Sequence, residues 1–145
     1  MSELPYSVVA RVGRLVEGRV FRLGSVDDVD RYIQRLAEVV DGLPPGTQGV
    51  LCADHRPAEL YTQAVTDRLV ESFQRMNTKL ERVAIVTGLR KHTLYMQLRR
   101  IVREAAYEPR QVFQIPEPAI THLMVALSPE ELARARAFLG EIDDG

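Results

Sequence analysis

Residues 49–61 read GVLCADHRPAELY, and this stretch decides the fold class. Gly49–Ala53 is a short unbroken apolar run, which is typical of a β-strand covered on both faces. The polar residues Asp54–Pro57 follow, and because proline suits the first turn of a helix we expect a helix to begin there. Apolar residues then recur at helical spacing, at Tyr61, Val65, Leu69, Phe73 and Met76. The stretch therefore predicts a buried strand, a turn and an amphipathic helix.

The segments on either side continue this alternation. Upstream, residues 6–16 and 19–23 alternate apolar and polar side chains around the turn-favouring pair Glu17-Gly18, which predicts a β-hairpin, and a helix capped by Ser25 follows. Downstream, strands are predicted at 82–88 and 110–115, and helices at 90–107, 117–127 and from Ser128 onward. This order predicts one α/β domain over residues 1–145, with a mixed sheet (N-terminal antiparallel hairpin, then parallel strands) covered by helices.

Composition excludes several classes of protein. Hydrophobic residues make up 46% of the 145 and charged residues 27%, as in an ordinary globular domain, and a formal net charge of −1 gives no general attraction to nucleic acid. Cys52 is the only cysteine, so no disulfide forms within the chain, and no apolar run approaches the length that spans a bilayer. We therefore expect a cytoplasmic protein with neither a membrane span nor a nucleic-acid partner.

The order of elements resembles the STAS fold, the sulphate-transporter and anti-sigma-factor-antagonist domain, and above all its stand-alone bacterial branch. The resemblance covers nearly the whole chain and is most specific in FQIPEPAITHL. There Phe113 precedes a small acidic turn at Glu117, and Ala119 and Leu123 match an Ala-x-x-Trp-Leu pattern in which His122 replaces the Trp. The resemblance implies a regulatory or protein-interaction module without catalysis, although proteins of similar architecture also carry lipids or other apolar ligands.

The sequence departs from that family at its switch. Anti-sigma-factor antagonists end their central strand with Asp-Ser-Ser-Gly and are controlled by phosphorylation of one serine. The matching positions here are Asp54, His55, Arg56 and Pro57, so the chain lacks the phospho-switch serine. The binding module that the resemblance implies would have to work without that switch.

A candidate anion site lies where two predicted parallel strands end. Ligands gather at the carboxyl ends of such strands, and helix N-termini there attract anions through their unpaired N–H groups. The polar side chains at this rim are Asp54, His55, Arg56, Arg90, Lys91 and His92. The alternative is that these residues only form turns, with Asp54 bonded to backbone N–H groups and Arg56, and with His55 and Arg56 facing water.

A candidate partner-binding surface lies on the predicted helix at 90–107. Leu94, Leu98 and Ile101 would face inward, which leaves the arginines outward, at Arg99, Arg100 and Arg103. Arg99 and Arg103 are four residues apart and repel each other unless an acidic group intervenes. The patch is either a docking surface for an acidic partner or a solvated helix face softened by Glu104 and Glu108.

No set of catalytic or metal-binding residues stands out. Cys52 lies inside an apolar strand, where a thiol is inert, and Thr93 beside His92 has no third group to orient it. The three histidines lack metal-ligand spacing, and no cofactor-binding motif is present. The sequence therefore favours a protein-interaction module that binds a partner protein or a second copy of itself. A carrier or sensor of a small apolar or anionic ligand is the alternative, and an enzyme using His55, Arg56 and Arg90 on an anionic substrate is the least favoured.

Overall fold

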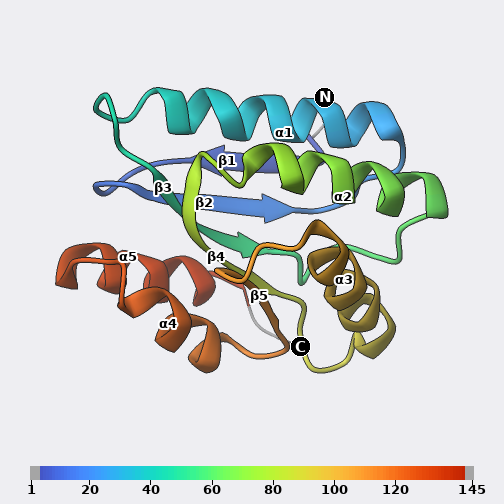
Figure 1. Cartoon of the computed structure of the whole chain (residues 1–145). Helices are drawn as coiled ribbons and strands as arrows, with labels where there is room; N and C mark the ends of the chain where they lie inside the picture. Colours follow the sequence, from blue (N-terminus) through green and yellow to red (C-terminus); the bar gives the residue numbers. More distant parts are fainter. Residues whose placement is uncertain (1–3, 143–145) are drawn as a thin grey trace.

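The computed structural model describes residues 4–142, which form a five-stranded mixed sheet between two layers of helices (Figure 1). The strands lie in chain order across the sheet. The first pair is antiparallel and every later pair is parallel, as the alternation of elements predicted. The strands are β1 (Tyr6–Val9), β2 (Leu15–Val20), β3 (Gly49–Asp54), β4 (Leu80–Val86) and β5 (Arg110–Phe113).

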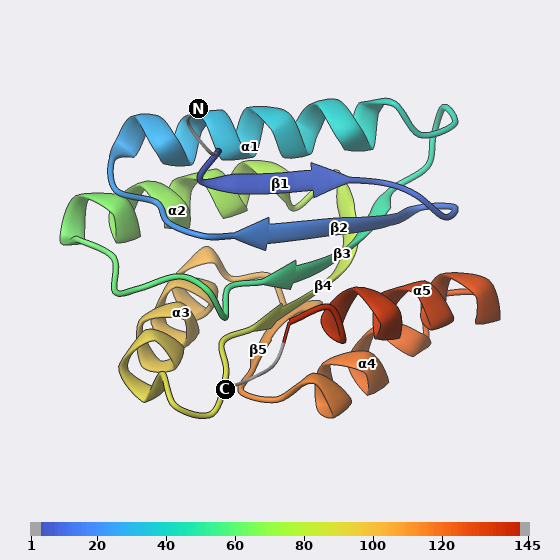
Figure 2. The same ribbon diagram turned by 180° about the vertical axis from the view of Figure 1, so that it is seen from behind.

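The helices divide unequally between the two faces. Three of them cover one face, and two short C-terminal helices cover β3–β5 on the other, where α5 also reaches β2 (Figures 1 and 2). They are α1 (Val26–Asp41), α2 (Gln63–Met76), α3 (His92–Ala105), α4 (Pro116–Met124) and α5 (Pro129–Leu139). The expected fold class is confirmed. No helix in the described part of the chain combines the length and the apolar character needed to cross a membrane.

The strands β3 and β4 contribute side chains to both hydrophobic cores, one on each face of the sheet. Because successive side chains of a strand point to opposite faces, Leu51 and Ile85 enter the core beneath α1–α3, whereas Val50 and Ala84 enter the core beneath α4 and α5. All four side chains are at most 4% exposed. The prediction that residues 50–53 and 83–86 are adjacent buried strands is confirmed, and their carboxyl ends therefore meet at one edge.

Several boundaries differ from the prediction; β4 ends at Val86 and β5 at Phe113, short of the expected 88 and 115, and two larger differences follow. Glu17 and Gly18 lie inside β2, and the chain turns at residues 10–14, where Gly13 takes a positive φ of 55° that glycine adopts without strain. Helix α2 begins at Gln63 rather than near Pro57, because the side chain of Thr62 caps it by accepting a hydrogen bond from the backbone N–H of Val65. The Ser25 cap of α1 and the Ser128 cap of α5 are as predicted.

Candidate functional site

Asp54 lies at the centre of a buried ionic cluster. It ends β3, is fully buried, and pairs in register with Arg19 on β2. Its carboxylate accepts hydrogen bonds from Arg19 Nε at 3.0 Å, Arg56 Nε at 2.8 Å, Arg56 Nη2 at 3.1 Å and the Arg56 backbone N–H at 3.1 Å. Burial alone would raise the pKa of Asp54, but the hydrogen bonds and charge of Arg56 outweigh it and hold that pKa below its ordinary value.

The same two arginines hold the C-terminal end of α5. Arg19 Nη2 donates to the backbone carbonyl of Phe138 at 2.7 Å, and Arg56 Nη2 donates to that of Leu139 at 2.6 Å. The guanidinium of Arg19 also stacks on the Phe138 ring, 4.1 Å from its centroid. The last carbonyls of a helix lack partners within the helix and carry partial negative charge, so two cations suit this position. The cluster thus fastens α5 to the sheet.

A second buried carboxylate extends this cluster along β2. Glu17 is 1% exposed and accepts hydrogen bonds from Arg11 at 2.8 Å and from Arg134 of α5 at 2.8 Å. Glu141 bridges Arg134, at 2.9 Å, and Arg19, at 3.0 Å. Glu17 and Arg19 are two apart on one strand, so both side chains point to the α5 face. The alternation of Glu17 and Arg19 along an otherwise apolar strand is the sequence feature that could have indicated the cluster.

His55 belongs to the opposite layer. Its ring is 1% exposed and its Nδ1 lies 2.7 Å from the Tyr61 hydroxyl, beneath α1 and α2. Burial lowers the pKa of His55 to about 4, although the nearby charge of Asp54 works against this, so the ring is neutral at ordinary pH. The expectation that His55 and Arg56 face water is wrong: both are buried, and they serve different faces of the sheet.

The apolar stripe of α2 packs as core. Val65, Leu69 and Phe73 are at most 7% exposed. The cavity left between the helices and the sheet, which also touches Tyr32 and His55, has a volume of about 10 Å³. A space of that size holds about one water molecule. An apolar ligand would therefore have to displace α2 in order to enter.

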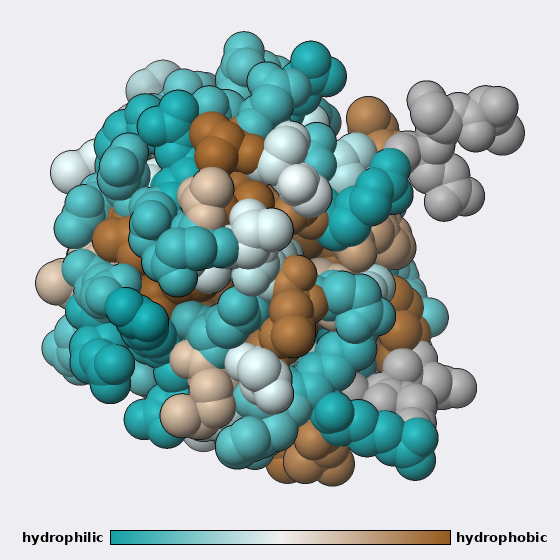
Figure 3. All heavy atoms as spheres, turned by 90° about the vertical axis from the view of Figure 1, so that its right-hand side faces the viewer, coloured by the Kyte–Doolittle hydropathy of each residue, from teal (hydrophilic) through white to brown (hydrophobic). Residues whose placement is uncertain are grey.

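The remaining rim residues surround a shallow hollow at the start of α3. Arg90 and His92 are exposed, while Lys91 Nζ donates to the Ala58 carbonyl at 2.6 Å and lies 3.6 Å from Glu59. The hollow measures about 270 Å³. Figure 3 faces this end of the molecule and shows small apolar groups separated by hydrophilic side chains. The predicted anion site thus keeps only Arg90, Lys91 and His92 at the surface, away from the buried Asp54, His55 and Arg56.

The arginines of α3 differ in their surroundings. Arg100 pairs with Glu104 at 3.5 Å. Arg99 stacks over Tyr95, 5.7 Å from the ring centroid, and neither Arg99 nor Arg103 forms an ion pair with any carboxylate of residues 4–142. Both are exposed. Of the two acidic residues expected to soften their repulsion, Glu104 pairs with Arg100, and Glu108 lines the same hollow as Arg99 and Arg103 but forms no ion pair with either.

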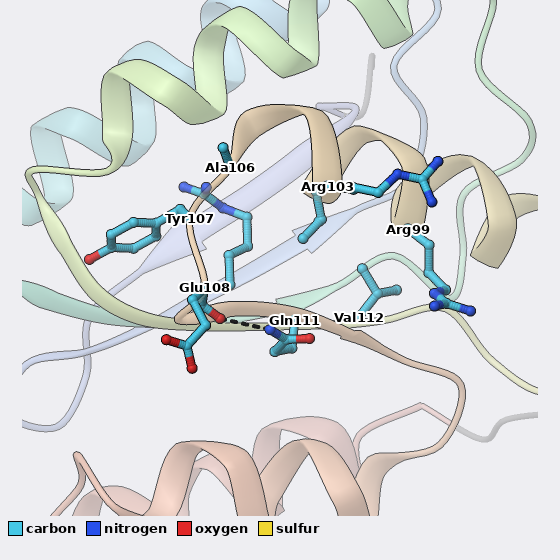
Figure 4. Close-up of a pocket in the computed structure, with 9 residues that line it drawn as sticks. Arg99, Arg103, Ala106, Tyr107, Glu108, Gln111 and Val112 are labelled. Atoms are coloured by element: carbon cyan, nitrogen blue, oxygen red, sulfur yellow. Dashed lines mark hydrogen bonds between the residues drawn. The ribbon is translucent and has the colours of Figure 1, made fainter.

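Arg99 and Arg103 also border a hollow of about 520 Å³ between α3 and β5 (Figure 4). It was not predicted from the sequence. Its lining includes Arg110, a residue that is 1% exposed and whose guanidinium donates hydrogen bonds to Asn77 Oδ1 at 2.7 Å and to the Phe73 carbonyl at 3.1 Å. Burial lowers the pKa of Arg110 to about 10, so it stays charged at neutral pH.

Two of the groups considered for catalysis, Cys52 and His55, are buried. Burial raises the pKa of the Cys52 thiol far above its ordinary value, which removes the thiolate that a nucleophile requires. The neutral His55 ring is closed off beneath α2. Within residues 4–142, no three His, Cys, Asp or Glu side chains lie close enough together to hold a metal ion.

Comparison with known proteins gives no relative by sequence: no family model and no curated protein matches the chain.

Proposed function

We propose that this chain is a non-catalytic, STAS-like regulatory or protein-interaction domain that binds an acidic surface of a partner protein through Arg99 and Arg103. The observation that carries the proposal is the charge of these two side chains. They lie one helical turn apart, are exposed, and form no ion pair with the carboxylates of residues 4–142, whereas Arg100 on the same helix pairs with Glu104. Like charges at this spacing destabilise a helix by a few tenths of a kcal/mol, a cost that an acidic partner would remove.

The rest of the molecule supports binding rather than chemistry. Asp54 and Arg56 bond to each other, and Arg56 also donates a hydrogen bond to the end of α5, whereas His55 is buried. The cavity beneath α1 and α2 has room for about one water molecule, which disfavours the alternative of an apolar ligand held between α2 and the sheet. The surface of α3 is left as the best supported place for recognition.

A charge reversal tests this proposal. The variant Arg99→Glu/Arg103→Glu changes two exposed arginines four residues apart on α3, and Arg31→Glu/Arg35→Glu makes the same change on α1. A partner would be identified by chemical cross-linking in cells that make the protein, then purified, and its Kd measured by calorimetry. We expect the α3 variant to weaken binding at least tenfold, or about 1.4 kcal/mol, and the α1 variant to bind normally.

Salt provides a second readout. Charges at a surface are screened over about 8 Å at physiological ionic strength, so the affinity of the natural chain should fall as salt is added, and that of the α3 variant should change less. If every identified partner bound both variants equally well, α3 would not be the binding surface and the proposal would fail.

A further inference from the structure

The hollow beside Arg99 and Arg103 is a groove that runs along the edge of the sheet. One wall is the side of α3 and the other is β5 together with the turn before it (Figure 4). In Figure 4, α3 and β5 run alongside each other in opposite directions, with Arg99 near Val112 and Ala106 near the start of β5. The lining residues are Arg99, Val102, Arg103, Ala106, Tyr107, Glu108, Arg110, Gln111 and Val112.

The wall formed by β5 is an unpaired strand edge. β5 is the last strand of the sheet and pairs only with β4. The carbonyls of Pro109 and Phe113 accept hydrogen bonds from Val83 N at 3.0 Å and Thr87 N at 2.9 Å, so these alternate residues direct their backbone groups toward β4. In a parallel ladder alternate residues direct their backbone groups to opposite sides, so Gln111 also faces β4 whereas Arg110 and Val112 face away from it. Arg110 and Val112 therefore present backbone groups to the groove.

One of these outward groups is already occupied. The N–H of Arg110 donates to the Tyr107 carbonyl at 3.0 Å, within the turn that precedes the strand. The carbonyl of Arg110 and both the N–H and the carbonyl of Val112 remain, and no described strand lies beyond them. Exposed edges of this kind are templates for another strand, and proteins usually cover or block them. Here the edge is left open beside two cations.

The spacing of those cations fits an extended chain. Four residues along a helix rise about 6 Å, which separates Arg99 from Arg103 along the axis of α3. Side chains two residues apart on a strand lie on the same face about 6.6 Å apart. Carboxylates at alternate positions of a strand laid along β5 would therefore face the two guanidinium groups in turn. Glu108, near the start of β5, disfavours further carboxylates at that end of the groove.

We propose that the groove binds an extended segment of a partner protein that adds to β5 as a further strand, with acidic residues at two alternate positions that pair with Arg99 and Arg103. This inference rests on the proposed function and specifies its partner chemistry. The backbone groups of Arg110 and Val112 hold the segment, and the arginines select the acidic-x-acidic pattern, which follows the usual division of roles in strand addition. The four residues of β5 set the length of the paired part.

The probe is a fluorescent six-residue peptide with glutamate at its second and fourth positions and valine or threonine elsewhere. Control peptides carry glutamine at both positions, carry the glutamates at adjacent positions, or have N-methyl groups on the edge that would pair with β5. Affinities for the whole chain are measured by fluorescence anisotropy. We expect each control peptide to bind at least tenfold more weakly than the probe.

Two variants test the two contacts separately. Arg99→Glu/Arg103→Glu should abolish binding of the probe, with Arg31→Glu/Arg35→Glu as the unaffected control. Val112→Pro removes an outward N–H but no hydrogen bond to β4, so the edge strand should tolerate it and lose the peptide. If this variant fails to fold, as judged by its amide NMR spectrum, the N-methylated peptide tests the same contact from the other side.

The outcomes separate this inference from the proposed function. If the N-methylated peptide binds as well as the probe, strand addition is wrong while charge recognition at α3 stands. If the probe does not bind at millimolar concentration, or if the chain forms a dimer that the α3 variant dissociates, the acidic partner segment is the wrong occupant. The proposal is supported if binding weakens both when the backbone contacts to β5 are removed and when the charge contacts to Arg99 and Arg103 are removed.

Discussion

Asp54→Asn is the sharpest test of the cluster that fastens α5 to the sheet. The substitution keeps the shape of the side chain but removes the charge that faces Arg19 Nε at 3.0 Å and Arg56 Nε at 2.8 Å. Both arginines are at most 8% exposed, so they cannot turn to water without losing their bonds to the carbonyls of Phe138 and Leu139. The variant therefore leaves two buried cations without their common counter-charge.

The expected loss is large relative to the stability of a domain. Removing one partner of a buried ion pair costs about 3–5 kcal/mol, out of the roughly 5–15 kcal/mol by which a domain is stable. With a urea dependence of about 2 kcal/mol/M, the unfolding midpoint at pH 7 should fall by about 2 M. Hydrogen exchange should also show α5 losing amide protection before α1–α3, because α5 is the helix that the arginines hold.

Acid should remove the difference in stability between the natural chain and the Asp54→Asn variant. Because the pKa of Asp54 lies below its ordinary value in the folded state, its stabilising effect is present above about pH 4, the pKa of an unfolded aspartate, and is lost as the pH falls through the folded pKa. Asparagine does not titrate, so the two stabilities should converge in acid. Glu141→Gln, at an exposed position of the same network, should cost less than about 1 kcal/mol. A loss below about 1 kcal/mol for Asp54→Asn at pH 7 would refute the role of the cluster.

Two further predictions concern His55 and the turn before β2. Burial lowers the pKa of His55 to about 4, so between pH 6.5 and 4 the unfolded chain binds a proton that the folded chain does not, and the free energy of unfolding should fall by about 3 kcal/mol over that range. In urea titrations at each pH, His55→Gln should remove this pH dependence. An unchanged pH dependence would contradict the burial of a neutral His55. Gly13→Ala should lose more stability than Gly46→Ala in thermal unfolding. Both positions have a positive φ, which costs alanine about 1–2 kcal/mol. At Gly13, but not at Gly46, the added methyl group would also clash with the Glu131 carboxylate. Equal losses of stability would show that this clash does not matter.

The sequence predicts the architecture well because local patterns determine it. Unbroken apolar runs identify β3 and β4, and the hydroxyl caps at Ser25 and Ser128 place the starts of α1 and α5 correctly. One error is local, because the Thr62 cap delays the start of α2, and another occurs where a distant residue decides. Glu17 looks like a turn residue, but Arg134, far along the chain, neutralises it inside β2, so the turn forms at Gly13 instead. No window of sequence around Glu17 contains that partner.

The candidate site shows the same limit. Asp54, His55 and Arg56 are neighbours in sequence, yet Asp54 and Arg56 serve the α5 face and His55 the α1–α2 face. The alternation of a strand predicts that Asp54 and His55 point apart, so this part of the division could be deduced. That Arg56 turns back to the carbonyl of Leu139 could not, because the position of α5 depends on tertiary packing.

The arginines around Asp54 and the arginines of α3 therefore differ in their availability to a partner. An anion competing for Arg19 or Arg56 would have to displace Asp54 and two carbonyls of α5, so binding there would carry the cost of freeing that helix. Arg99 and Arg103 require no such displacement, since no carboxylate of residues 4–142 pairs with them and a strand edge lies open beside them. A partner that carries negative charge therefore gains more at α3 than at the buried cluster, which is why we place recognition at α3 and assign the buried arginines to the architecture.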